Sequence, residues 1–256
     1  MPTDPRHDVA RFYDLLSTAP DDLAFYRGLI TSPDARVLEL GCGTGRVLAP
    51  LADHCAYIHG LDHSESMLTF CRQRLANRGT GPDRAQVDQA DVADFNLGQT
   101  FDLVTAPYRV FQCLKDDRQV AGVMSCIREH LAPGGVGVLN VFHPKHERDA
   151  MIGSWARDGE ELVHSHGNNG HVIRQYERRT RVDTDPLVIY PELVYRTYEH
   201  DELVDEVVHP LTMRCWYPEE FLDLIKAHGF TIRRTWGGYH DEPYAQGPEL
   251  VVAFSA

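Results

Sequence analysis

The sequence predicts an α/β fold: a mostly parallel, seven-stranded sheet with helices on both faces and an antiparallel β cap inserted after the fifth strand. Between residues 36 and 100, short apolar runs alternate with helical patterns, which is the rhythm of repeated β-α units. Beyond Pro144, longer alternating segments rich in Val, Tyr, Thr and Arg are typical of antiparallel strands. A chain of 256 residues has room for one large domain with such a cap.

These changes of pattern divide the chain into three expected regions. Residues 1–143 form the core with N-terminal helices, and residues 144–215 form the cap insertion. The β-α rhythm returns in residues 216–256, which supply the C-terminal helix and the last two strands of the core.

The expected strands of the sheet are short and apolar. In chain order they are residues 36–40, 57–61, 86–90, 101–105, 136–142, 230–236 and 250–254. Ser64 is expected to cap a helix because Met67, Leu68, Cys71 and Leu75 follow it on one helical face. The cap strands are expected at residues 172–182, 187–199 and 203–212.

Composition narrows the classes of function. With 25 basic and 38 acidic residues the net charge is −13, which repels nucleic acids and anionic membranes. No stretch approaches the roughly 18 apolar residues of a membrane span, and the first twenty residues lack a signal-peptide core, so a cytoplasmic location is expected. The six cysteines contain no C-x-x-C pair, and the sequence from His164 to His171 is interpreted as an exposed loop; we therefore expect no metal.

A glycine-rich turn follows the first expected strand. Gly41, Gly43 and Gly45 would let the backbone approach a ligand closely at the start of a helix. The dinucleotide-binding fingerprint requires a further glycine at position 46, where this chain has Arg46. The turn therefore suits an amino-acid moiety and a ribose better than a pyrophosphate.

Two acidic residues end the next two expected strands. Asp62 can accept hydrogen bonds from both hydroxyl groups of a ribose, and Asp91 can accept one from an adenine amino group. A helix cap or a turn residue is the alternative explanation for either one. Three ligand-compatible positions at three successive strand ends favour a nucleoside ligand.

At these residues the chain resembles the class I S-adenosylmethionine (SAM)-dependent methyltransferases. The segment Val37 to Arg46 is similar to the first motif of that family, Gly60 to Leu68 to the second, and Ala90-Asp91-Val92 to the third. Leu131-Ala132-Pro133-Gly134-Gly135 is similar to the turn before the family's fifth strand. The resemblance implies a Rossmann-like fold and an enzyme that moves a methyl group from SAM, leaving S-adenosylhomocysteine.

The resemblance also implies roles for individual residues. Gly41, Gly43 and Gly45 would wrap the methionine part, Asp62 would bind the ribose, His63 and Met67 would flank the adenine, and Asp91 and Val92 would contact its edge. Tyr13 and Tyr26 would lie in helices that cover the cofactor. The complete expected cofactor set is Tyr13, Tyr26, Glu39, Gly41, Cys42, Gly43, Gly45, Arg46, Asp62, His63, Met67, Asp91, Val92 and Ala106.

The acceptor side of the site is less specific, because methyl transfer mainly requires alignment of a nucleophile and exclusion of water. Tyr108, Arg109, His143 and Tyr13 are the expected catalytic residues. His143 is the candidate general base, or else it only holds the adjoining loop. Arg109 would bind an acidic substrate group or pair with an acidic residue at the rim.

The expected acceptor is a small molecule, with nitrogen, oxygen and carbon all open as the atom methylated. A protein methyltransferase and a SAM-binding module without activity are the alternatives. The tyrosines and tryptophan of the cap would line an apolar pocket or form a homodimer face, or else take part in ordinary packing between strands.

Overall fold

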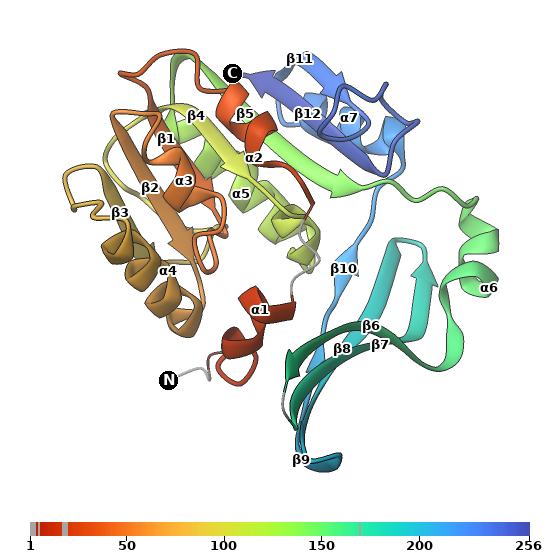
Figure 1. Cartoon of the computed structure of the whole chain (residues 1–256). Helices are drawn as coiled ribbons and strands as arrows, with labels where there is room; N and C mark the ends of the chain where they lie inside the picture. The colour runs from red at the N-terminus through yellow and green to blue at the C-terminus, as the bar shows by residue number, and fades with distance from the viewer. Residues whose placement is uncertain (1–3, 5, 17–19, 169) are drawn as a thin grey trace.

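A computed structural model describes residues 4, 6–16, 20–168 and 170–256 of the chain. The chain forms two sheets, a seven-stranded core sheet and a five-stranded cap sheet (Figure 1). The predicted first region starts at residue 1, which lies outside the described residues. No described helix is both long enough and apolar enough to cross a membrane.

The core sheet has the strand order β11-β12-β5-β4-β1-β2-β3. Only β12 runs antiparallel to its neighbours β5 and β11, so the sheet is mostly parallel and the predicted Rossmann-like α/β fold is confirmed. Its strands are β1 (Arg36–Leu40), β2 (Tyr57–Asp62), β3 (Ala85–Gln89), β4 (Phe101–Ala106), β5 (Leu131–Phe142), β11 (Thr231–Trp236) and β12 (Glu249–Ser255).

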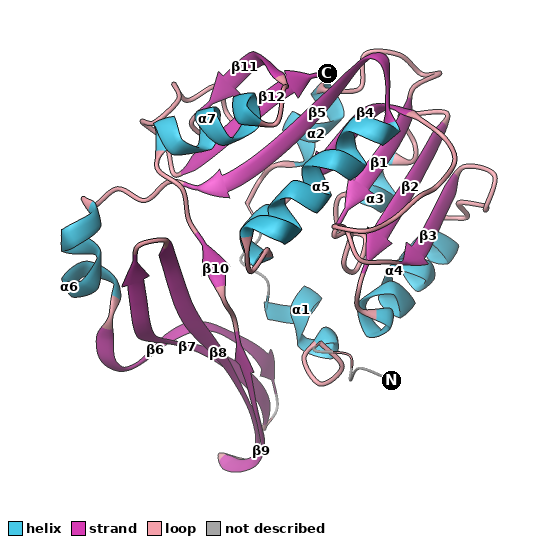
Figure 2. Ribbon diagram, turned by 180° about the vertical axis from the view of Figure 1, so that it is seen from behind, coloured by secondary structure: helices cyan, strands magenta, loops and turns pink. Residues whose placement is uncertain are grey.

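Helices cover both faces of this sheet. The face in front in Figure 2 carries α5 (Asp117–His130) and α7 (Pro218–Ala227), whose apolar residues pack on the sheet. The opposite face carries α2 (Leu23–Gly28), α3 (Leu48–Leu51) and α4 (Glu65–Asn77). Ser64 caps α4 as predicted, because its hydroxyl accepts a hydrogen bond from the Met67 amide at 3.2 Å.

The cap sheet follows β5 after two short helical turns, η2 (Arg148–Ala150) and α6 (Met151–Trp155). Its strands are β6 (Arg157–Asn168), β7 (His171–Thr184), β8 (Leu187–Glu199), β9 (Glu202–Pro210) and β10 (Met213–Arg214). Every pairing within it is antiparallel, as predicted.

The interpretation of the sequence from His164 to His171 as a loop was wrong, because His164 and His166 lie within β6 and His171 is the first residue of β7. Almost all of β6 is exposed on both faces, so it lacks the alternation of apolar and polar residues by which a strand is recognised. Among the described residues, no cluster of three or more His, Cys, Asp or Glu side chains could hold a metal ion.

The short helix α1 (Ala10–Leu16) lies between the carboxyl ends of the core strands and the cap sheet (Figure 1). On the cap side, Phe12 stacks on Tyr195 with ring centroids 5.0 Å apart. On the core side, the Asp14 carboxylate accepts hydrogen bonds from the Thr44 hydroxyl at 2.7 Å and from Arg74 at 2.5 Å. Helix α1 therefore connects the glycine turn of the core with the cap.

Candidate functional site

The glycine turn between β1 and α3 has three residues in the left-handed region, Gly41 (φ 67°), Gly43 (φ 54°) and Gly45 (φ 76°). A Cβ atom on Gly41 would lie 2.5 Å from Val110, and one on Gly45 would lie 2.5 Å from the sulfur of Cys71. A Cβ atom on Gly43 would meet no atom within 4 Å. The first and third glycines thus face packed protein, while the middle glycine faces open space where a ligand can approach.

The Asp62 carboxylate lies directly beside this turn, and only 7% of the residue is exposed. Its two oxygens accept hydrogen bonds at 2.9 Å from the backbone amides of Gly43 and Ser64. His63, largely exposed, has its Nδ1 3.5 Å from the same carboxylate. The fold therefore brings together the first two predicted motifs, and Asp62 also braces the turn.

Asp91 follows β3 at the same edge of the sheet. Its side chain is exposed and accepts a hydrogen bond from the Ala93 amide at 2.9 Å, the geometry of a turn residue. The neighbouring Val92 is half-buried, and Met67 in α4 is buried. Gln89 connects this strand end to that of β2 by donating to the His63 carbonyl at 2.9 Å.

Behind the glycine turn lies a group of buried polar side chains. Arg46 forms two hydrogen bonds, at 2.6 and 2.8 Å, with Asp22, whose side chain is fully buried. Glu39 is 2% exposed, and burial raises the pKa of its carboxyl well above the usual range. Within the described part of the chain, Glu39 Oε2 and the Tyr26 hydroxyl have no hydrogen-bond partner. Buried polar atoms without partners mark places where a ligand or a water completes the structure.

The loop after β4 holds Tyr108 and Arg109, both in the left-handed region, with φ of 55° and 66°. Such backbone costs roughly 1 to 3 kcal/mol for each residue that is not glycine. Arg109 donates from Nε to Glu249 at 3.1 Å, so the pairing with an acidic residue is the arrangement found. The partner is 4% exposed and lies in the sheet, not at the rim. Ala106 ends β4 and is buried.

Tyr108 has aromatic and cationic neighbours. The Arg46 guanidinium lies 5.4 Å from the centre of its ring, and the Tyr13 ring meets it edge-on at 6.4 Å. Burial raises the pKa of Tyr13 above its usual value and that of Tyr195, on cap strand β8, to about 12. These phenols are therefore uncharged at neutral pH.

His143, the candidate base, is held by the loop before β12. Its amide donates to the Pro248 carbonyl at 2.9 Å, and its Nδ1 lies 3.0 Å from the Gly247 carbonyl oxygen. Because a carbonyl only accepts, Nδ1 is the donor in this contact. His143 therefore holds the loop before β12.

The sequence did not single out several residues of this region, namely Asp14, Asp22, Asn140, His209 and Glu249. Each lies far along the chain from the residue it contacts, so no local spacing connects them. His209 in β9 is 8% exposed, and its Nε2 has no hydrogen-bond partner among the described residues. Burial, together with Arg6 and His63, lowers the pKa of His209 to about 4.

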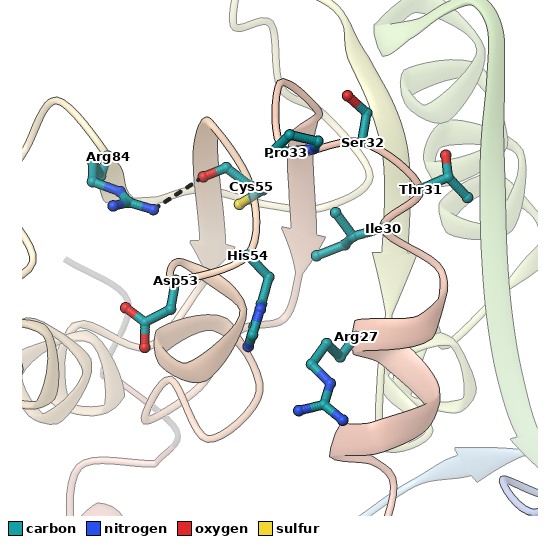
Figure 3. A pocket seen from close by; sticks show the side chains of 9 residues that line it. All are labelled: Arg27, Ile30, Thr31, Ser32, Pro33, Asp53, His54, Cys55 and Arg84. Atoms are coloured by element: carbon teal, nitrogen blue, oxygen red, sulfur yellow. Dashed lines mark hydrogen bonds between the residues drawn. The ribbon is translucent and has the colours of Figure 1, made fainter.

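A cavity of about 400 Å³ lies elsewhere, at the amino ends of the strands (Figure 3). Its lining comes from the segments that precede β1, β2 and β3, and Arg84 there donates to the Cys55 carbonyl. Open α/β sheets bind ligands at the carboxyl ends of their strands. This cavity therefore contains none of the predicted site residues.

Comparison with known proteins identifies the family. Residues 37–135 match a family described as "Methyltransferase domain". The chain is 36% identical over 211 residues to a dTDP-3-amino-3,4,6-trideoxy-α-D-glucopyranose N,N-dimethyltransferase of Streptomyces venezuelae, covering 81% of this chain and 80% of the relative.

Solved structures agree with this relationship. SAM-bound CalS10, an amino pentose methyltransferase from Micromonospora echinaspora, superposes with a TM-score of 0.69 at 26% identity, covering 92% of this chain and 91% of that one. The CcbJ methyltransferase of Streptomyces caelestis shares the fold, with a TM-score of 0.75 at 22% identity over 99% of this chain and 98% of that one. The chain belongs to the class I SAM-dependent methyltransferases, and its cofactor is SAM.

Proposed function

We propose that this enzyme methylates the amino nitrogen of a small molecule, an amino sugar carried on a nucleotide. The observation that supports this most directly is the set of phenols around the acceptor loop. Tyr13 and Tyr108 meet edge to face, and Tyr195 of the cap influences the pKa of Tyr13. Aromatic ring faces attract cations, which suits a reaction that transfers positive charge from sulfur to nitrogen.

The residues beside the glycine turn fit the cofactor. Gly41, Gly43 and Gly45 would carry the methionine part, with the open face of Gly43 toward it. The unpartnered oxygens of Glu39 and Tyr26 are suited to its amino group. Around this turn we also assign Cys42, Arg46 and Ala106 to the cofactor side.

The nucleoside part would lie along the strand ends. Asp62 keeps lone pairs free for the ribose hydroxyl groups, because each of its oxygens accepts one backbone hydrogen bond. Met67 and His63 would lie against the adenine, and Asp91 and Val92 at its edge.

The chemistry needs little from the protein beyond alignment. When bound, SAM supplies a methyl group on a positively charged sulfur. The amine nitrogen forms a bond to the methyl carbon while the carbon–sulfur bond breaks with its electron pair on sulfur. The nitrogen then loses a proton, for which Nε2 of His143 is the proposed acceptor. The rings of Tyr13 and Tyr108, which meet edge to face, hold the amine in line and exclude water.

The cationic side chain of Arg6 supports the proposal that the acceptor carries an anionic group. Arg6 forms no ion pair with any residue that the structure describes, and its charge lowers the pKa values of Tyr13, Tyr195 and His209. An arginine without a carboxylate partner suits a phosphate group. Two relatives named for dTDP-linked amino sugars, 36% and 29% identical to this chain, agree with this charge.

The test is incubation of the protein with SAM and a dTDP-linked 3-amino sugar, followed by mass spectrometry. We expect one or two methyl groups on the amine and none on the matching 3-hydroxy sugar. The free amino sugar without its nucleotide should react at least about tenfold more slowly, the ~1.4 kcal/mol of one lost charge-assisted contact. Methylation of the hydroxy sugar, or of a peptide N-terminus in preference to the amino sugar, would overturn the proposal.

A further inference from the structure

Two adjacent residues in the acceptor loop, Tyr108 and Arg109, have a backbone conformation that non-glycine residues rarely adopt. A strained pair of this kind persists only where the surrounding structure holds it, and such strain is concentrated at functional sites.

What holds the pair is a closed set of hydrogen bonds. The Arg109 amide donates to Asn140 Oδ1 at 3.1 Å, and the Arg109 guanidinium donates to Glu249 through Nε and Nη2. Asn140 Nδ2 donates in turn to Glu249 Oε2 at 3.0 Å. Backbone and side chain of Arg109 are therefore fixed through the same carboxylate.

The Glu249 carboxylate is held by two neighbouring strands of the core sheet. Asn140 is fully buried in β5, and Glu249 is the first residue of β12, where it pairs with Phe142 at the end of β5. Burial opposes the charge on Arg109, but Glu249 keeps the pKa of the guanidinium above its usual value. The ion pair thus connects the loop to the sheet, with the Glu249 side chain 5% exposed and the Arg109 side chain 39% exposed.

The other side of the loop faces the cofactor turn. Val110 occupies the space that a side chain on Gly41 would fill, with its methyl carbons 2.5 and 2.6 Å from the position of that absent Cβ. Arg46 lies over the Tyr108 ring at 5.4 Å. The position of Tyr108 is therefore set between the glycine turn and the two strands that carry Asn140 and Glu249.

We infer that Glu249 is a positioning residue for methyl transfer: through Arg109 and Asn140 it holds the strained turn that presents Tyr108 to the acceptor. The contacts that hold the turn are independent of the acceptor, whereas the role of Tyr108 rests on the proposed function. Glu249 itself touches neither substrate nor cofactor in this assignment.

The first experiment needs no acceptor. Hydrogen exchange of the peptide covering residues 107–114 is compared between the unmodified protein and Glu249→Gln. We expect exchange in this peptide to become about tenfold faster, because the loop loses its charged anchor. Asp241→Asn is the matched control, since it removes an exposed carboxylate in the loop before β12 that pairs with Arg234 of β11, and Asn tolerates its positive φ. Unchanged exchange in Glu249→Gln would overturn the inference even if amino sugars are methylated.

The second experiment separates positioning from general stability. With whichever acceptor is turned over, Glu249→Gln should lower kcat about tenfold and leave the Kd for SAM within threefold. In a Tyr108→Ala background the same change should have no further effect on kcat, whereas a merely structural role would lower it equally in both backgrounds. If Glu249→Gln does not fold, Arg109→Lys replaces it, since it keeps the charge and loses the two-point contact; a kcat equal to that of the unmodified enzyme would then refute the role.

Discussion

Most residues assigned to the cofactor come from three consecutive β-α units, whereas those assigned to the acceptor come from α1, the loop after β4, and the cap strands β8 and β9. We call the first group, Gly41–Gly45 with Asp62 and Asp91, the cofactor half. The second group, Tyr13, Tyr108, Arg109, Tyr195 and His209, is the acceptor half. A site built from residues close together in the sequence is specified by short motifs. A site built from several distant elements can acquire a different substrate when any one of those elements changes.

The largest expected effect is a loss of folding stability at acidic pH, caused by His209 in the acceptor half. The pKa of His209 lies at about 4 in the folded protein against 6.5 for the unperturbed side chain. The unfolded chain therefore binds the proton first, and the free energy of unfolding should fall by about 3 kcal/mol as the pH drops from 6.5 to 4. Urea unfolding across this range, compared with His209→Asn, measures the contribution. Equal pH slopes in the two proteins would show that His209 is not the group responsible.

The second prediction concerns the open face of the glycine turn. Gly43→Ala should weaken SAM binding by about a hundredfold, or ~2.7 kcal/mol, because its methyl group occupies space assigned to the cofactor. Gly98→Ala is the matched control, since Gly98 also has a positive φ (62°) and open space around its Cβ position. Both should lower stability by about 1 kcal/mol. Calorimetric titration with SAM showing equal affinities for the two variants would exclude Gly43 from the cofactor half.

The third prediction tests Asp62, the last residue of β2. Asp62→Ala should weaken SAM binding by about tenfold, the ~1.4 kcal/mol expected for a lost charge-assisted hydrogen bond. Asp102→Ala removes a carboxylate that also binds a backbone amide, that of Arg36, but at the amino ends of the strands. It should leave the affinity unchanged. If the two variants bind SAM alike, the ribose assignment fails.

The smallest effect is expected in the acceptor half. Tyr108→Phe should lower kcat/KM by about fivefold, or ~1 kcal/mol, because only one neutral hydrogen bond is lost and the ring remains. The Kd for SAM should stay the same. Steady-state kinetics with the methylated amino sugar provide the measurement, and a matching loss of SAM affinity would place Tyr108 in the cofactor half instead.

The sequence predicted the core and the cofactor half better than the acceptor half. The seven core strands and the cap insertion could be predicted from periodicity, because most core strands are buried and are bounded by turn residues. β6 could not, since its exposed residues lack that alternation. Spacing predicted that Asp62 lies beside Gly43, because consecutive parallel strands end at one edge.

No comparable rule connects Arg109 with Glu249, which are 140 residues apart. The sequence predicted only that Arg109 would bind an acidic group or pair with one. An acidic residue just before an apolar strand is usually exposed, so nothing local marked Glu249 as buried. Contacts of this kind depend on which strands are neighbours in the sheet. β12 is the last strand in the chain, and it lies beside β5.

Helix α1 contacts both halves, through Asp14 on the glycine turn and Phe12 on the cap. A single element shared by two ligand sites makes their affinities thermodynamically linked. If a bound acceptor raises the affinity for SAM by some factor, bound SAM must raise the affinity for the acceptor by the same factor.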